Sequence, residues 1–459
     1  MHTMWKPRLE RKTQTRAPIY LALAHAIASD IQSGRLRAGD RLPPQRDLAD
    51  ALGVTVTTVT RGYAEAERLG LVSGEVGRGT FIRPPAFAPL SAHDENLVDL
   101  GTNALLPQAH GGELVSALAA LVARTEPQRL FNYQPHAGLP EHRAAAAEWL
   151  RQSGVRADPA DTILTSGAQH AMAVALATIT APRATVLCEA VTYTGMRSLA
   201  HHLHVRLQEV PLDREGLLPD ALEDAALESG GRVLYCMPSI QNPTGRVMSR
   251  KRRKDVAAVA EKLDLTIVED DTYGFLAPGV SPLASLVPDR TFYLTSLSKS
   301  VAPGLRIGFL RAPAGWIDRI VGAVFATTVI VTPLSAAAAA EWITNGTVAR
   351  VVEWKRQEIR ARQQLTREIL GDQISGAMES QHVWLPLPSR WPAEDFARQA
   401  RQRGVIVTPG REFAVARHDP PNAIRICLGP PAERVSLTRA LSILAEILKG
   451  TPKAFGTAI

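Results

Sequence analysis

One lysine in this 459-residue sequence is surrounded by groups that suit covalent chemistry. Lys299 follows Ser296 and Ser298 in the run Tyr293-Leu-Thr-Ser-Leu-Ser-Lys, and Arg306 comes after a Pro-Gly pair. A lysine amine forms a Schiff base with an aldehyde, while hydroxyls and a guanidinium bind a phosphate. Pyridoxal 5'-phosphate (PLP) carries both of those groups, so the run predicts a PLP site.

Other polar motifs follow apolar, strand-like runs. Ser166-Gly167-Ala168 opens a helical segment, so its amides could bind a phosphate. Asn242-Pro-Thr-Gly and Glu269-Asp270-Asp271 follow further runs. Each motif alone is more common as an ordinary turn or helix cap. Beside a pyridine nitrogen, however, Asp270 would keep the ring protonated.

The elements that must position these motifs alternate along the chain. Five strand-like runs are separated by alanine-rich helical segments, and the runs begin at Thr162, Thr185, Arg232, Leu265 and Thr291. Such alternation predicts an α/β fold with a mainly parallel sheet covered on both faces. Ligands bind to such sheets at the carboxyl ends of the strands, where the motifs fall.

Taken in order over roughly residues 99–445, the motifs resemble fold-type I PLP enzymes of the aspartate aminotransferase class. The resemblance implies a large PLP-binding domain with a smaller C-terminal α+β subdomain. It implies a Schiff base at Lys299, a bond from Asp270 to the pyridine nitrogen, and contacts from Asn242 and Tyr273 to the ring hydroxyl oxygen. The phosphate would be surrounded by Ser166, Gly167, Ala168, Ser296, Ser298 and Arg306.

Three further residues gain a role only from this resemblance. Tyr193, in EAVTYTG, would stack on the ring, and Tyr133, ahead of HAGLPEHR, would reach the phosphate of a neighbouring subunit. Arg425, in AIRICLG, would bind a ligand carboxylate through two hydrogen bonds. Alone, the tyrosines would be read as core or rim aromatics and Arg425 as a surface residue.

The first 82 residues show a different pattern. They contain twelve Lys/Arg and eight Asp/Glu, a net charge of +4, whereas the whole chain has a formal net charge of +7. Ile19, Leu23, Ile27 and Ile31 form one stripe of a predicted helix over residues 17–32. A short helix around residues 42–49, a turn at Gly53 and a third helix capped by Thr55 follow.

On the third predicted helix Val59, Tyr63 and Ala66 share one face, and Thr57, Thr58 and Arg61 share another. Residues 71–82 then read as a β-wing with its tip at Gly77-Arg78-Gly79. This spacing is that of a helix-turn-helix, although a small three-helix domain with incidental surface polarity has the same periodicity.

The full string from about Pro18 to Ile82 closely resembles the winged helix-turn-helix of the GntR family of bacterial regulators. The resemblance implies a phosphate contact from Arg46, major-groove contacts from Thr57, Thr58 and Arg61, and a minor-groove contact from Arg78. Many family members have arginine where this chain has Val56, so the base preference is expected to differ.

We therefore predict a DNA-binding domain over residues 1–82, a proline-rich linker over 83–97 and a PLP-binding effector domain over 98–459. A cytoplasmic protein is expected. Cys188, Cys236 and Cys427 lie in apolar runs typical of buried thiols, and the N-terminus lacks an apolar signal segment. The apolar stretch 321–340 is interrupted by Thr and Pro, which disfavours a membrane span.

Two weaker signals remain. His201, His202 and His204 cluster without matching Cys, Asp or Glu ligands, so no metal site is expected. The basic run 250–254 fits a solvated helix start capped by Ser249 better than a second DNA surface, because an apolar face follows it.

The fused pair resembles the MocR subfamily of transcriptional regulators. That resemblance implies a head-to-tail homodimer that binds operator DNA and senses an amino acid-like effector, or PLP itself, by aldimine exchange at Lys299. The alternative is a PLP-dependent aminotransferase that carries a DNA-binding appendage, and weak or partial transamination is compatible with both. The effector, the operator and the sign of regulation are not predicted.

Overall fold

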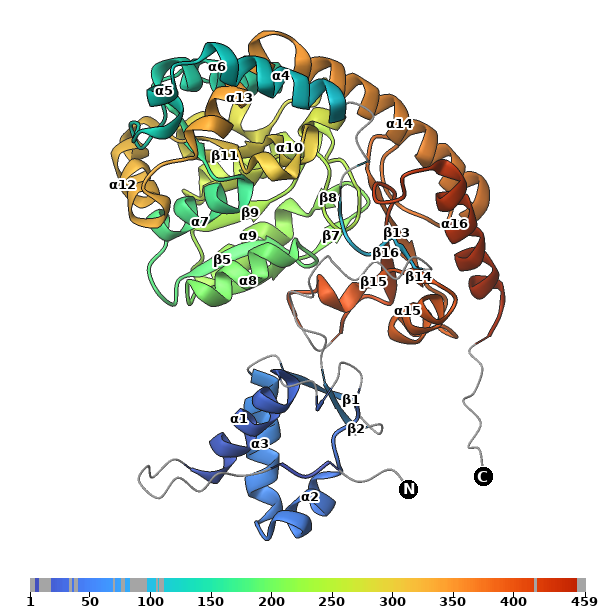
Figure 1. Cartoon of the computed structure of the whole chain (residues 1–459). Helices are drawn as coiled ribbons and strands as arrows, with labels where there is room; N and C mark the ends of the chain where they lie inside the picture. Colours follow the sequence, from blue (N-terminus) through green and yellow to red (C-terminus); the bar gives the residue numbers. More distant parts are fainter. Residues whose placement is uncertain are drawn as a thin grey trace. The chain divides into compact units, whose positions relative to one another are not determined.

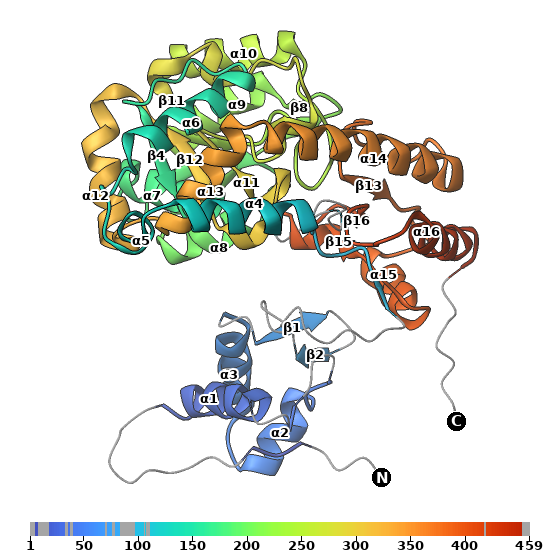
Figure 2. The same cartoon turned by 45° about the horizontal axis from the view of Figure 1, so that its top comes forward.

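The chain divides into two compact units, Met1–Asp94 and Glu95–Ile459. The structure is a computed structural model that describes residues 5–7, 18–32, 35–36, 40–68, 71–75, 79–82, 97–104, 106, 111–416 and 419–451. Figures 1 and 2 show the two units. The predicted linker lies outside the described residues except for Leu97, so its boundaries stay a prediction.

The first unit contains a three-helix core and a two-stranded wing. The helices are α1 (Ile19–Gln32), α2 (Gln45–Leu52) and α3 (Val56–Arg68), and the strands are β1 (Val72–Glu75) and β2 (Gly79–Ile82). The wing strands pair antiparallel. Gly53 ends α2 in a left-handed conformation, and the Thr55 hydroxyl accepts a hydrogen bond from the Thr58 amide at 3.2 Å. The predicted turn at Gly53 and the predicted helix cap at Thr55 are therefore confirmed.

The hydrophobic core of this unit joins all three helices. Leu23 and Ile27 of α1 are buried against Val59, Tyr63 and Ala66 of α3, as predicted. The predicted stripe on α1 is wrong at one position, since Ile19 is 46% exposed. Ile19 is the first residue of α1. The buried part of the helix begins one turn after it, at Leu23, and the periodicity of the stripe does not indicate this boundary.

The second unit is built around a seven-stranded sheet with the order β4-β12-β11-β10-β9-β5-β6. Its strands are β4 (Thr162–Thr165), β5 (Thr185–Glu189), β6 (Arg206–Val210), β9 (Val233–Cys236), β10 (Thr266–Asp270), β11 (Thr291–Ser296) and β12 (Gly308–Arg311). All neighbours pair parallel except β12, which is antiparallel to β11 and to β4. The mainly parallel sheet and all five predicted strands are confirmed, while β6 and β12 were not predicted.

Alternate residues along the central strands enter different hydrophobic clusters. Val186, Tyr235 and Val268 pack into one cluster, whereas Leu187 and Leu234 pack into the other. A sheet buried on both faces requires this alternation. The helices of the large part are α4 (Gly111–Arg124), α5 (Pro127–Phe131), α6 (Pro140–Gln152), α7 (Ala168–Ile179), α8 (Thr194–His202), α9 (Pro219–Ser229), α10 (Arg250–Lys262), α11 (Leu297–Ser300), α12 (Ile317–Thr328) and α13 (Pro333–Thr344).

A smaller C-terminal subdomain follows, as expected. The long helix α14 (Thr347–Leu370) runs from the large part into it (Figure 2). Its sheet contains β13 (His382–Pro386), β16 (Ala423–Cys427) and β15 (Thr408–Pro409), and its helices are α15 (Ala393–Gln402) and α16 (Arg434–Lys449). The short strands β3 (Val98–Asp99) and β14 (Val405–Ile406) pair parallel, so the chain just after the predicted linker joins this subdomain.

The basic run at the start of α10 is only partly solvated. Ser249 caps the helix as expected, by accepting a hydrogen bond from the Arg252 amide at 3.2 Å. Arg253, however, is 1% exposed, and its guanidinium lies 3.5 Å from Glu269. Arg252 forms an ion pair with Asp213 at 2.8 Å. The expectation of a solvated run is wrong for Arg253, because its acidic partner lies on a strand that is distant in the sequence.

The three cysteines are buried and unpaired, as predicted. In the part of the chain that the structure describes, no helix is long and apolar enough to cross a membrane. The apolar stretch 321–340 instead falls on α12 and α13, which are separate helices.

The backbone of β12 lies very close to the turn after β4, so a larger residue at Gly308 should destabilise the fold. A Cβ atom on Gly308 would lie 2.6 Å from the carbonyl carbon of Gly167. Gly308→Ala should therefore lower the free energy of unfolding by about 1–3 kcal/mol, because the two segments must separate. Calorimetry of the full chain measures the change in melting temperature.

Gly322→Ala is the matched control, since a Cβ at this position in α12 meets nothing within 4 Å. Alanine should be neutral or stabilising by about 0.5–1 kcal/mol in that helix. Equal melting temperatures for the Gly308 variant and the wild type would contradict the packing argument.

Candidate cofactor site and DNA-reading helix

A cavity of about 370 Å³ lies at the carboxyl ends of the parallel strands. A volume of this size suits a cofactor-sized ligand. The cavity brings together ten residues predicted from the sequence: Ala168, Tyr193, Asn242, Asp270, Tyr273, Ser296, Ser298, Lys299, Arg306 and Arg425. Their roles toward PLP stay predictions, but their convergence is a property of the fold.

Lys299 extends into the cavity from the four-residue helix α11, directly after β11. Its amine donates a hydrogen bond to the backbone carbonyl of Asn103. Burial lowers the pKa of Lys299 from 10.5 to about 8, and the nearby charges of Arg425 and Arg306 act in the same direction. A larger share of the amine is therefore neutral, and so nucleophilic, near physiological pH.

Asp270 ends β10 and lines the same cavity. Its carboxylate accepts hydrogen bonds from the Tyr235 hydroxyl at 2.9 Å and from the Thr272 amide at 3.1 Å. Burial raises the pKa of Asp270, while these hydrogen bonds counteract the rise. A cationic ring nitrogen beside this carboxylate would favour its charged form.

The predicted phosphate end is formed where the turn after β4 meets Arg306. The Arg306 guanidinium donates to the Ser166 carbonyl at 3.1 Å. Gly167 has a φ of +91°, and a Cβ there would lie 2.9 Å from Nη2 of Arg306. The glycine thus keeps the guanidinium close to the start of α7. Ser298 contributes a buried hydroxyl that has no hydrogen-bond partner among the described residues.

Arg425 reaches the cavity from β16 in the smaller subdomain. It donates to the Asn242 side-chain oxygen at 2.9 Å and to the Gly101 carbonyl at 2.6 Å. Its guanidinium also lies 4.6 Å from the centre of the Phe413 ring. The Arg425 Nε atom is buried without a partner in the described part of the chain, so a donor is available for a ligand carboxylate.

Asn103 is a cavity residue that sequence reasoning missed. Its amide donates to the Tyr273 hydroxyl at 2.7 Å, its carbonyl accepts from Lys299, and its side-chain oxygen accepts from Gln381. Gln169, Met172, Thr194, Met237, Thr272 and Pro303 also line the cavity without having been predicted. Asn103 follows a two-residue strand, which carries no recognisable motif.

Three predicted residues do not line the cavity. Ser166 and Gly167 do not line it but touch it indirectly, through Arg306. Tyr133 lies outside it and is 85% exposed within the single chain. Exposure of this extent fits a side chain that reaches another subunit.

The residues around the cavity fit PLP by their chemistry. The Lys299 amine, whose pKa is lowered, fits the aldehyde of PLP. The buried carboxylate of Asp270 fits the pyridine nitrogen, and Arg306, beside the turn at Gly167, fits the phosphate. The partnerless Ser298 hydroxyl fits a phosphate oxygen.

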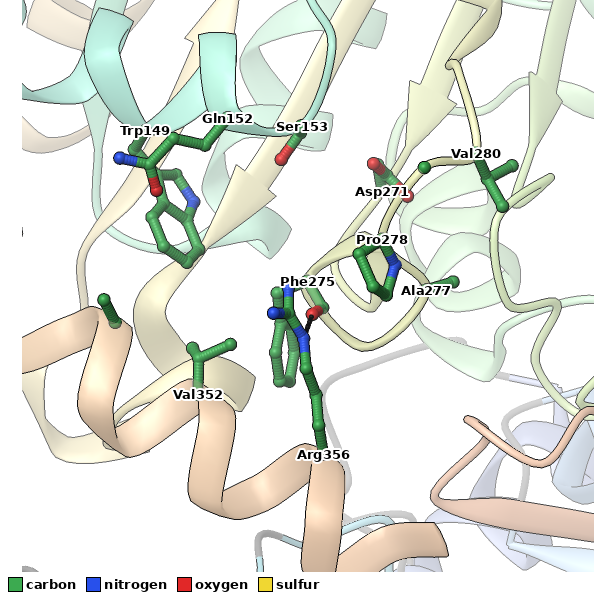
Figure 3. A pocket seen from close by; sticks show the side chains of 13 residues that line it. Trp149, Gln152, Ser153, Asp271, Phe275, Ala277, Pro278, Val280, Val352 and Arg356 are labelled. Carbon is green, nitrogen blue, oxygen red and sulfur yellow. Dashed lines mark hydrogen bonds between the residues drawn. The ribbon is translucent and has the colours of Figure 1, made fainter.

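A separate cavity of about 110 Å³ lies between α6, the turn after β10 and α14 (Figure 3). Asp271 lines it, so the consecutive residues Asp270 and Asp271 face different cavities. The Asp271 carboxylate accepts a hydrogen bond from the Tyr293 hydroxyl at 2.5 Å.

The predicted DNA-reading residues lie on α2 and α3. Arg46, Thr57 and Arg61 are exposed, and Thr58 is half-buried, with its hydroxyl 2.9 Å from that of Thr55. The Arg61 guanidinium lies 4.3 Å from the centre of the Tyr20 ring, which orients it. Arg78 lies outside the described residues. Contacts to DNA stay predictions for all five residues.

Within the described ranges, no group of three or more His, Cys, Asp and Glu side chains is arranged to hold a metal ion.

Two family matches cover the two units. Residues 19–82 match the family described as "Bacterial regulatory proteins, gntR family". Residues 95–443 match the family described as "Aminotransferase class I and II". The second match spans most of the chain.

Two proteins named as HTH-type transcriptional regulators are similar to this chain, one of them over almost its whole length. The "Uncharacterized HTH-type transcriptional regulator YdeF" of Bacillus subtilis is 30% identical over 451 residues, which cover 97% of this chain and 96% of that protein. The "HTH-type pyridoxine biosynthesis transcriptional regulator PdxR" of Corynebacterium glutamicum is 28% identical over 370 residues, covering 76% of this chain and 78% of that protein.

The crystal structure of LysN, an α-aminoadipate aminotransferase from Thermus thermophilus complexed with N-(5'-phosphopyridoxyl)-L-leucine, superposes with a TM-score of 0.71 at 26% identity. The superposition covers 78% of this chain and 93% of that one. The aminotransferase fold expected from the sequence is confirmed.

The lowered pKa of Lys299 predicts the pH dependence of cofactor attachment. Only the neutral amine attacks an aldehyde, so the attachment rate should rise with pH and reach half its maximum near pH 8. Stopped-flow absorbance after adding PLP to the apoprotein measures this rate. A midpoint at the ordinary lysine value of 10.5 would contradict the effect of burial on Lys299.

Proposed function

The chain belongs to the MocR-type family, in which a GntR-type DNA-binding domain precedes a class I and II aminotransferase domain, and we propose that it senses an amino acid-like ligand at its PLP site. It is a PLP-dependent transcriptional regulator that binds operator DNA. The observation that carries the sensing proposal is the cavity that joins Lys299, Asp270 and Arg425. In this proposal, ligand occupancy of the cavity changes operator affinity.

The bound cofactor supplies an aldehyde carbon that accepts a primary amine and a ring that withdraws electrons. Lys299 provides the amine that attaches the cofactor. Asp270 pairs with the ring nitrogen, and Asn242 and Tyr273 bind the ring hydroxyl oxygen. Tyr193 stacks on the ring. Around the phosphate lie Ser166, Gly167, Ala168, Ser296, Ser298 and Arg306, completed by Tyr133 of a neighbouring subunit.

The effector is a small compound that carries both a primary amine and a carboxylate. The amine competes with Lys299 for the cofactor, and Arg425 binds the carboxylate. Support comes from the buried Arg425 Nε atom, which has no partner in the described part of the chain. A carboxylate bound to Arg425 would share the guanidinium with Asn242 and Gly101, which accept hydrogen bonds from its two Nη atoms.

The segment that follows the linker connects these events to the DNA-binding domain. Lys299 donates to the Asn103 carbonyl and Arg425 donates to the Gly101 carbonyl. Both groups that respond to cofactor and effector therefore hold the chain a few residues after the predicted linker. A change in either hydrogen bond alters how that segment is held, which supports transmission along the chain.

Operator DNA is read by α3, with Thr57, Thr58 and Arg61 in the major groove and Arg46 on a phosphate. Arg78, predicted from the sequence to lie at the wing tip, would contact the minor groove. The protein acts as a head-to-tail homodimer, which the high exposure of Tyr133 in the single chain supports. Two readers in one dimer would bind two half-sites, so their spacing sets operator affinity.

A second candidate function is transamination. The lowered pKa of Lys299 favours it, because a neutral amine can move a proton at the substrate α-carbon. A third candidate, in which PLP itself is the signal, follows from the likeness to a regulator named for pyridoxine biosynthesis.

Two substitutions should show that cofactor attachment and operator binding depend on different domains. Lys299→Ala should abolish the visible absorbance of the attached cofactor while leaving most non-specific DNA affinity. Arg61→Ala should weaken binding to an operator selected by the wild type by roughly 1–3 kcal/mol and leave cofactor uptake intact. Absorbance spectra and fluorescence anisotropy measure the two outcomes.

Arg403→Ala is the control for Arg61→Ala, since it removes the same charge from the second unit, where Arg403 pairs with Glu446. Unchanged absorbance in the Lys299 variant would reject the cofactor site. Unchanged operator affinity in the Arg61 variant would remove α3 from the DNA interface.

The test between the candidate functions is a titration of the PLP-loaded protein with amino acids, read by absorbance, keto-acid formation and operator affinity. A spectral change with altered affinity and no sustained keto-acid formation is expected of a sensor. Sustained turnover with unchanged DNA affinity would favour the enzyme. A change in operator affinity on PLP loading, with no further change on adding amino acids, would favour the third candidate.

A further inference from the structure

Helix α14 contains a buried lysine whose role the cofactor site does not explain. Lys355 is 2% exposed. Within the described part of the chain, no carboxylate lies within ion-pair distance of its amine. Burial, together with the nearby charge of Lys299, lowers the pKa of Lys355 from 10.5 to about 7. Lysine is almost never fully buried without a partner, so the position needs a structural reason.

The partners of Lys355 are backbone carbonyls at the base of the cofactor-binding lysine. Its amine donates to the carbonyl of Lys299 at 3.3 Å and to that of Val301 at 3.1 Å. These carbonyls lie at and just beyond the end of α11, which has only four residues. The last carbonyls of a helix lack partners within the helix, so donors must come from elsewhere. Lys355 supplies them from 54 and 56 residues away.

The same helix also holds the segments that follow other cavity residues. Arg356 donates to the Phe275 carbonyl at 2.7 Å, two residues after Tyr273 (Figure 3). Arg362 donates to the carbonyls of Leu428 at 2.8 Å and Pro431 at 2.7 Å, just beyond the strand that carries Arg425. Three cationic side chains of α14 thus fasten the chain next to Lys299, Tyr273 and Arg425.

We propose that Lys355 is a positioning residue that fastens α11 to α14, so that the Lys299 amine is held at the cavity before the cofactor arrives. Because Arg362 fastens the segment after Arg425 to the same helix, α14 also connects the ligand-binding strand to the cofactor-binding lysine. The inference rests on the proposed function only in taking Lys299 as the attachment point.

A holding role has a measurable consequence for cofactor binding. Without the two hydrogen bonds, α11 loses its fixed end and the Lys299 amine samples positions away from the cavity. Attachment then carries an added cost of ordering. The loss should resemble that of one or two net hydrogen bonds, about tenfold in PLP affinity or about 1.4 kcal/mol.

The experiment compares Lys355→Met, Lys355→Gln and wild type in the full chain, without DNA. Methionine fills the space but donates nothing, whereas glutamine keeps a neutral donor. We expect the Met variant to attach PLP more slowly and to retain it about tenfold more weakly. We expect the Gln variant to recover most of the affinity. Visible absorbance during loading and dialysis measures both quantities.

The pH dependence of PLP retention gives a second readout that space filling alone would not move. Burial and the nearby Lys299 lower the pKa of Lys355 to about 7, so the difference between the wild type and the Met variant should be larger below pH 7, where Lys355 is charged and its hydrogen bonds are charge-assisted, than above it. The control is Arg360→Met, which removes a cation from α14 whose side chain is 56% exposed and lies 3.7 Å from Glu379. It should behave as wild type.

Wild-type affinity in the Met variant would overturn the proposal, as would an equal loss in the Met and Gln variants. Should the Met variant not fold, amide hydrogen exchange on the wild-type apoprotein remains decisive. Residues 297–301 should already be protected before PLP is added, and rapid exchange there would also overturn the proposal. Failure of the proposed function itself would appear separately, as wild-type protein that attaches no PLP or operator affinity that ignores amino acids.

Discussion

The parallel direction of six strands is the constraint on which the site depends. The strands β4, β5, β9, β10 and β11 end at the same edge of the sheet, and β12 begins there because it runs antiparallel. Five of these strands lead into or out of predicted groups, so residues from Ala168 to Arg306 meet around one cavity. Packing helices on both faces fixes the strands, and the strands fix the geometry of the site.

Burial of ionisable groups gives this cavity its chemistry. Burial lowers the pKa of Lys299 to about 8 and raises the pKa of Asp270. Each shift disfavours charge in a site of low polarity. A cofactor with a phosphate and a basic ring nitrogen supplies charges opposite to those of Arg306 and Asp270. The PLP site is therefore prepared by desolvation and completed by the cofactor.

The segment after the predicted linker and helix α14 both hold the large part of the second unit to its smaller subdomain. Asn103 and Gly101 contact Lys299 and Arg425 in the first case, and Lys355 and Arg362 hold the neighbouring backbone in the second. In both cases a basic side chain donates hydrogen bonds to backbone carbonyls. Burial shields these hydrogen bonds from water, which strengthens them.

The sequence by itself determined the two-part organisation, the five central strands and the residues that carry chemistry, because motifs and short-range periodicity encode them. It also determined the local caps at Thr55 and Ser249. Tertiary structure alone decided the contacts of Asn103 and Lys355, the burial of Arg253 against Glu269, the exposure of Ile19 and the strands β6 and β12. Several of these contacts join residues far apart in the chain, and burial depends on all the elements that pack nearby, so no local pattern of residues records them.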